Sequence, residues 1–123
     1  MKRVIKSAQF GMEPSGHEYA DAMSWKINDL RAKYEPFVVK PSGIDMLNPF
    51  DTLEVEVDDE DGITQEWYID HNRSQDIYTL YHNYDYSNIK SRAALYSECK
   101  KLGKFDSVDS AMSWLFENVN WSE

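Results

Sequence analysis

The sequence has little cysteine and no long apolar segment. Its single cysteine, Cys99, excludes an internal disulfide framework and fits a reducing compartment. No apolar run approaches the roughly 20 residues that a membrane-spanning helix needs. The basic residues at the start are not followed by the apolar segment of a signal peptide. These absences predict a cytoplasmic protein with no membrane partner.

Sequence motifs of common enzymes and metal sites are also missing. One cysteine and three histidines, without CxxC or HxxxH spacing, argue against a zinc site. Neither the nucleophile elbow GxSxG nor a phosphate-binding P-loop is present. Cys99 falls on the apolar stripe of a predicted helix and is interpreted as a small core residue. The sequence therefore predicts no catalytic residue, no metal and no cofactor, and a small enzyme is the least favoured functional hypothesis.

Basic residues are absent from residues 51–70, which hold nine acids and no Lys or Arg. The whole chain has 22 acids and 13 Lys and Arg, for a net charge of −9, so 13 acids face 13 bases outside this segment. The net charge therefore lies on one short segment. The nine acids are Asp51, Glu54, Glu56, Asp58, Asp59, Glu60, Asp61, Glu66 and Asp70.

The same segment predicts the centre of the fold. Residues 53–57 alternate apolar and acidic side chains, which is typical of a strand with one buried and one exposed face. Residues 59–62 predict a turn, with Gly62 free to adopt a positive φ. Residues 63–70 predict the return strand, and residues 76–82 a third strand. We predict a three-stranded antiparallel meander.

Helical patterns lie on both sides of the meander. Ser15 and Glu18 form a capping box before an apolar stripe that runs to Tyr34, and Pro36 ends this helix. Residues 37–39 predict a short strand, and residues 3–10 a strand or an extended arm.

Two further helices are predicted near the carboxyl end of the chain. One begins at Ser87 or Asn88 and ends before Gly103 as its C′ residue, and the last begins at Asp106 or Ser107. The predicted fold class is α+β. At 123 residues we expect a single domain, an antiparallel β-meander of three to four strands packed by an N-terminal helix and two C-terminal helices.

The periodic stripes also predict which side chains are buried. We expect the first and last helices to cover the apolar face of the meander, leaving Glu54, Glu56 and Glu66 exposed on the other face. The residues predicted to form the core are Met23, Ile27, Val55, Trp67, Met112 and Leu115.

Two binding motifs fail on inspection. With Gly62 at position six of an EF-hand loop, Val57 and Tyr68 occupy positions one and twelve, where Asp and Glu are required. The two helices around Gly103 have the spacing of a helix-turn-helix, but the second helix carries acids that DNA phosphates would repel. The overall acid excess also argues against direct nucleic-acid binding.

The acidic segment and a series of aromatic residues together indicate a binding surface. Tyr and Trp anchor protein interfaces, and a concentrated negative field steers a basic partner. The leading hypothesis is a small acidic protein that docks on and blocks a basic surface of a partner protein, including a nucleic-acid site, as a nucleic-acid mimic. Its size, acidity and aromatic content are like those of small inhibitors that phages and mobile elements use against host defence nucleases. The residues predicted to bind the partner are Asp51, Glu54, Glu56, Asp58, Asp59, Glu60, Asp61, Glu66, Tyr68, Tyr84 and Tyr86.

Two alternatives fit the same residues. An immunity protein or antitoxin that neutralises a cognate toxic enzyme also needs acids against a basic active site. Alternatively, the charges serve only solubility and the protection of a sheet edge.

Overall fold

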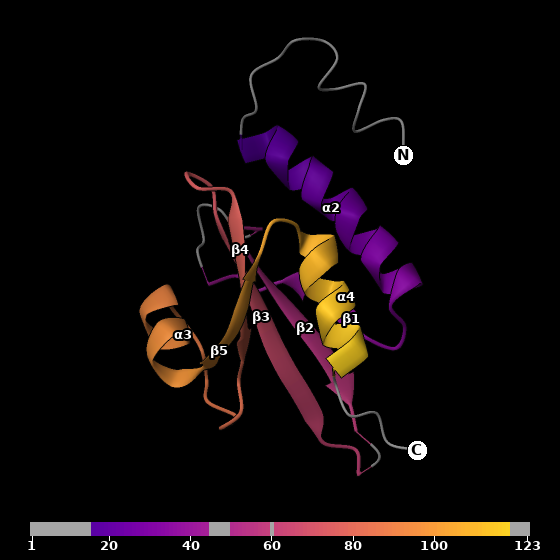
Figure 1. Cartoon of the computed structure of the whole chain (residues 1–123), viewed down its shortest axis with the longest axis vertical. Helices are drawn as coiled ribbons and strands as arrows, with labels where there is room; N and C mark the ends of the chain where they lie inside the picture. Colours follow the sequence, from indigo (N-terminus) through magenta and orange to yellow (C-terminus); the bar gives the residue numbers. More distant parts are fainter. Residues whose placement is uncertain (1–15, 45–49, 60, 119–123) are drawn as a thin grey trace.

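The computed structural model describes residues 16–44, 50–59 and 61–118, with side-chain burial described from residue 21 onward. Five antiparallel strands form one sheet in the order β1-β2-β3-β4-β5, so every strand pairs with its neighbours in sequence (Figure 1). The elements in chain order are α2 (Gly16–Lys33), β1 (Val38–Pro41), β2 (Thr52–Asp58), β3 (Thr64–Asn72), β4 (Ile77–His82), α3 (Arg92–Glu98), β5 (Lys100–Phe105) and α4 (Val108–Asn118).

The central hairpin forms as the alternation predicts. In β2 and β3, Val55 lies opposite Trp67 and Glu54 lies opposite Tyr68, so apolar and polar side chains sort to opposite faces of the sheet. Gly62 has a φ of +80° in the turn, a conformation that glycine adopts without steric cost. The predicted meander of three strands is confirmed, with β4 as its third strand.

Helices α2 and α4 cover one face of the sheet (Figure 1). The main core lies between these two helices and the inward side chains of β1 to β4. All six residues predicted for the core are buried, with exposed fractions between 0% and 7%: Met23, Ile27, Val55, Trp67, Met112 and Leu115. Ser107 caps α4, since its hydroxyl accepts a hydrogen bond from the Ser110 N–H at 3.0 Å. The predicted roles of the first and last helices are therefore confirmed.

The prediction of three to four strands is wrong, because the sheet has a fifth strand where a helix was expected to continue. Helix α3 begins after Ser91, whose hydroxyl accepts from the Ala94 N–H at 3.1 Å, and it ends at Cys99, which is already extended. Residues 100–105 then pair with β4, placing Gly103 opposite Leu80. Pairing with an open strand satisfies backbone groups along a whole edge, and this tertiary gain outweighs the local helical pattern.

Helix α3 lies on the face of the sheet opposite α2 and α4 (Figure 1). Its Leu95 is fully buried and forms a second, smaller apolar cluster with Tyr68 and Cys99. Burial of Cys99 was predicted correctly, although the residue ends the helix rather than lying within it. Tyr96, on the same helix, is 51% exposed.

Some predictions lie outside the described residues. They include the strand or arm at residues 3–10 and the capping residue Ser15. Among the residues that the structure describes, no helix is long and apolar enough to cross a membrane.

Candidate partner-binding surface

The acids of residues 51–70 separate into three groups along the β2–β3 hairpin. One group lies at the turn, one lies on the sheet face opposite α2 and α4, and one is buried at the other end of the hairpin. Glu60 lies outside the described residues. The groups are the acidic turn (Asp58, Asp59 and Asp61), the glutamate cluster (Glu54, Glu56 and Glu66) and the buried pair (Asp51 and Asp70).

The acidic turn is held by hydrogen bonds to neutral groups. The Asp59 carboxylate accepts from the N–H groups of Asp61 at 2.9 Å and Ile63 at 3.0 Å. The Asp58 carboxylate accepts from the Thr64 hydroxyl at 2.7 Å. The hydrogen bond from Ile63 is the main cause that lowers the pKa of Asp59 below its usual value, so this carboxylate is ionised at neutral pH. Among the described residues, no Lys or Arg forms an ion pair with the acidic turn, and its charge therefore faces solvent uncompensated.

An aromatic loop of residues 83–87 lies beside the acidic turn. Its Tyr84 and Tyr86 are 58% and 57% exposed, unusually high values for large aromatic side chains in a folded protein. The Gln65 side-chain amide donates both to the Asp59 carboxylate, at 3.1 Å, and to the Tyr86 hydroxyl, at 2.9 Å. One side chain thus joins the acidic turn to the aromatic loop, although they are more than twenty residues apart in sequence.

Asn83 holds the aromatic loop in one conformation. It is 1% exposed, and its side-chain amide donates to the Glu66 carboxylate at 3.0 Å and to the Ser87 carbonyl at 2.8 Å. Its amide oxygen accepts from the Ser87 N–H at 3.0 Å. Tyr86 has a φ of +54°, a strained region for a tyrosine, which persists because these bonds determine the backbone around it. The exposed aromatic side chains are therefore presented by a preorganised loop.

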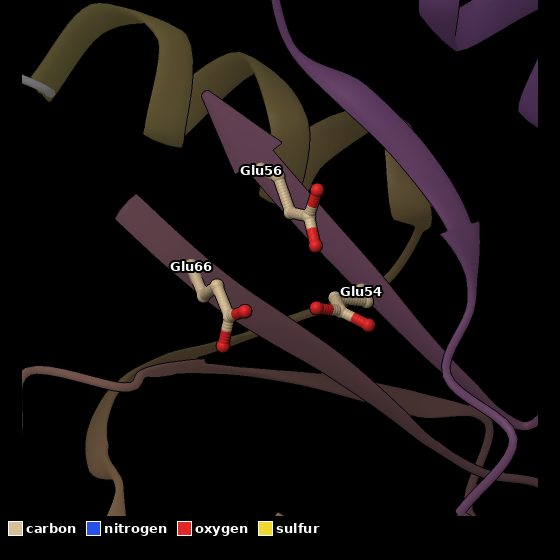
Figure 2. A group of neighbouring side chains, drawn as sticks. All are labelled: Glu54, Glu56 and Glu66. Atoms are coloured by element: carbon tan, nitrogen blue, oxygen red, sulfur yellow. The ribbon is translucent and has the colours of Figure 1, made fainter. Parts of the chain in front are cut away.

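The glutamate cluster lies on neighbouring positions of β2 and β3 (Figure 2). One carboxylate oxygen from each of the three glutamates lies within 4.8 Å of the others. Lys40 on β1 contacts the Glu56 carboxylate at 3.1 Å, and this contact raises the lysine pKa. The cluster therefore holds three carboxyl groups against one cation.

Crowding and burial change the charge of the cluster. Burial, a hydrogen bond to Glu56 and the charge of Glu66 raise the pKa of Glu54 to about 8. The same hydrogen bond, reinforced by Lys40, lowers the pKa of Glu56. At neutral pH, Glu54 is therefore mainly protonated and donates to the Glu56 carboxylate. The prediction that these glutamates are exposed is wrong, because all three are half-buried.

Two kinds of chemistry are open to such a cluster. Three convergent carboxylates are the ligands that hard divalent cations prefer. A carboxyl group that stays protonated near pH 7 is also a feature that general acid catalysis requires. Sequence reasoning placed these three glutamates on one face but missed that their carboxyl groups converge, although the register that places Glu56 directly opposite Glu66 follows from the turn at Gly62.

The buried pair forms the centre of an ion network at the other end of the hairpin. Asp51 and Asp70 are only 6% and 7% exposed. The Nε atom of Arg73 lies 2.7 Å from the Asp51 carboxylate, and the Nε atom of Arg92 lies 3.0 Å from the Asp70 carboxylate. The Arg92 Nε–H forms no hydrogen bond with that oxygen, so the contact is an ion pair alone.

Further bonds complete the network. Asp70 also accepts hydrogen bonds from the hydroxyl groups of Thr52, at 3.1 Å, and Tyr96, at 2.7 Å. Since Arg92 and Tyr96 belong to α3, the network fastens that helix to β3. A small pocket of about 280 Å³ lies among these side chains.

The predicted binding residues are therefore not all on one surface. Asp51 lies in the ion network, and Tyr68 is 5% exposed beneath α3, where burial raises the pKa of its hydroxyl far above the usual value. Of the predicted partner-binding residues that the structure describes, five lie together at the turn end of the hairpin: Asp58, Asp59, Asp61, Tyr84 and Tyr86.

The chain was compared with protein-family models, curated proteins and solved structures. None of these three comparisons finds a match. Its function must therefore be argued from the geometry of its own side chains.

Proposed function

We propose that the protein is a small acidic binding protein that docks on a basic surface of a partner protein and blocks it. The observation that carries this proposal is the double hydrogen bond of Gln65, which unites the acidic turn with the aromatic loop. Negative charge attracts and orients a basic partner, whereas exposed Tyr84 and Tyr86 supply the contact area that charge alone does not give.

The acidic turn is suited to this role because its charge is not neutralised within the described chain. Asp58, Asp59 and Asp61 form no ion pair there, unlike Asp51, Asp70 and Glu56. Preorganisation of the aromatic loop by Asn83 lowers the entropy that the loop would lose on binding.

Sheet-edge protection accounts poorly for these charges. Glu54 and Glu56 lie in the part of β2 that is paired on both sides, with β1 and with β3, and so they do not lie on a free edge. Where the blocked surface is a nucleic-acid site, the carboxylates take the place of phosphates, and the protein acts in the cytoplasm as a nucleic-acid mimic of the kind that phages use against host defence.

The test is capture of a partner with the immobilised full-length chain, using two variants of equal charge. The acidic-turn variant carries Asp58→Asn, Asp59→Asn and Asp61→Asn. The control variant carries Asp21→Asn, Asp29→Asn and Glu117→Gln, which neutralises three exposed acids on α2 and α4. Circular dichroism establishes that both variants are folded.

We expect the wild type and the control variant to capture the same basic protein, and the acidic-turn variant to lose it. If the captured protein binds nucleic acid, the wild-type chain should also displace a fluorescent duplex from it. Capture of a cognate toxic enzyme, inhibited without nucleic-acid displacement, would favour the immunity-protein alternative. Equal capture by the two variants would contradict the proposal.

A further inference from the structure

A pocket of about 420 Å³ opens beside the acidic turn. It lies between the carboxyl end of α4 and strands β3, β4 and β5. Pockets of this size are at the small end of those that hold ligands, and suit a single side chain or a molecule of similar size. The residues that line it are Asp59, Gln65, Trp67, His82, Leu102, Trp114, Leu115 and Asn118.

The wall of this pocket is largely aromatic. His82 stacks on Trp67 with ring centroids 5.2 Å apart and ring planes 18° from parallel. Trp67 itself is 5% exposed, so its indole is largely covered by its neighbours. Trp114 on α4 is only half-buried and offers a second ring, with Phe105 packed against it at 6.1 Å. A planar cation can therefore lie against ring faces inside the pocket.

The charge of the lining is negative. Among the described residues that line the pocket, Asp59 is the single charged one, and its carboxylate is ionised and fixed in direction by the backbone of the turn. Burial, with a smaller contribution from the charge of Lys100, lowers the pKa of His82, so its ring is neutral at pH 7. The buried Nε2 atom of His82 has no hydrogen-bond partner in the described part of the chain.

We propose that this pocket receives an arginine side chain of the basic partner. A guanidinium group is planar, stacks on aromatic rings and donates hydrogen bonds to a carboxylate. Trp114 offers the ring. Asp59 offers its Oδ2 atom, which accepts from Gln65 and has a second acceptor position, whereas its Oδ1 atom already accepts from two backbone N–H groups. Lysine carries the same charge, but its compact ammonium group does not stack in this way. The inference rests on the proposed function, since it identifies the side chain by which the basic partner is anchored.

The test uses N-acetyl-arginine amide as the probe and the full-length chain at constant ionic strength. Nuclear magnetic resonance follows the indole N–H signals of Trp67 and Trp114 and the ring signals of His82. N-acetyl-citrulline amide has nearly the same shape without the charge, and N-acetyl-lysine amide has the charge without the planar group. We expect saturable shifts with the arginine probe, weaker binding of the lysine probe and no binding of the citrulline probe.

Matched variants locate the binding site. Asp59→Asn should weaken binding of the arginine probe roughly tenfold, whereas Asp61→Asn, which removes the same charge from the same turn outside the pocket lining, should change it little. Trp114→Leu keeps an apolar side chain but removes the ring, and should weaken binding roughly threefold. Lys100→Gln removes a cation next to His82 and should strengthen binding about twofold.

Several results would overturn the inference. They are equal binding of arginine and citrulline probes, equal binding of arginine and lysine probes, equal effects of Asp59→Asn and Asp61→Asn, or no saturable shift. Failure of this proposal is distinct from failure of the proposed function. A partner captured through the acidic turn by a chain that does not bind the arginine probe would retain the function and reject the pocket. Binding of the arginine probe by a chain that captures no basic partner would retain the pocket and reject the proposed function.

Discussion

The two ends of the β2–β3 hairpin use the same residue type in opposite ways. At one end, Asp51 and Asp70 are buried and face Arg73 and Arg92 at 2.7 Å and 3.0 Å. At the other end, the acidic turn bonds only to N–H and hydroxyl groups and keeps its charge in solvent. Charge that is paired at close range projects little field, whereas unpaired charge steers a partner. The number of acids in a segment therefore does not define a binding surface, and the position of the basic side chains does.

The largest expected effect contrasts single substitutions at the two ends. Asp70→Ala leaves Arg92 without its nearest counter-charge and removes the acceptor of the Tyr96 hydroxyl, so we expect a loss of about 3 kcal/mol in the free energy of unfolding. Asp61→Ala removes an exposed charge and should cost under about 0.5 kcal/mol. Urea denaturation of both variants measures the difference. Similar losses would mean that the two ends do not differ in role.

The second expected effect is the pH dependence of stability, which comes from the glutamate cluster in the middle of the hairpin. The folded-state pKa of Glu54 is raised to about 8, so between its ordinary value of 4.5 and that value the folded state binds more protons than the unfolded state. The free energy of unfolding should therefore fall as the pH rises through this window. We expect a fall on the order of 1–2 kcal/mol, less than the shift of Glu54 alone implies, because Glu54 and Glu56 share the proton.

The variant Glu54→Gln tests this directly. The glutamine side chain keeps the hydrogen bond to Glu56 but cannot ionise. The variant should therefore lack the fall in unfolding free energy that Glu54 causes in the wild type between pH 5 and pH 8. Chemical denaturation across this pH range compares the two proteins. The same pH dependence in the wild type and in the variant would show that Glu54 ionises normally.

The smallest effect is that of salt on stability. The acids of the acidic turn repel one another and the other acids of the chain, and salt screens such repulsion over roughly 8–10 Å. Added salt should therefore raise the unfolding midpoint, which corresponds to a gain of under about 1 kcal/mol in the free energy of unfolding. The acidic-turn variant should lose most of this dependence, and the control variant should keep it. A midpoint that falls with salt in the wild type would mean that ion pairs such as Lys40 with Glu56 dominate instead.

Periodicity predicted the main elements of the fold well. The alternation at residues 53–57, the positive φ of Gly62 and the apolar stripe through Met23 and Ile27 are local signals, and the structure follows each of them. The fifth strand carries no such signal. Residues 100–105 include three lysines and a glycine, and they become a strand because β4 offers an open edge. A contact that depends on a distant strand is not encoded in a local pattern.

The candidate surface was predicted only in part, for a similar reason. Composition showed that the net charge lies on one segment. It did not show that Arg73 and Arg92 would neutralise the buried end of that segment. Nor does sequence spacing reveal that Gln65 would connect Asp59 with Tyr86. The pocket beside Trp114 combines four separate elements with the turn, so no single motif indicates it.

The most direct test of the central claim is the rate at which the captured partner associates with the chain at several ionic strengths. The account predicts that the acidic-turn variant associates more slowly than the wild type and with a shallower dependence on salt, because steering by the turn is lost. The control variant, with the same loss of charge on α2 and α4, should follow the wild type closely. If the two variants are slowed equally, net charge rather than the acidic turn governs binding, and the contrast between the two ends of the hairpin has no functional meaning.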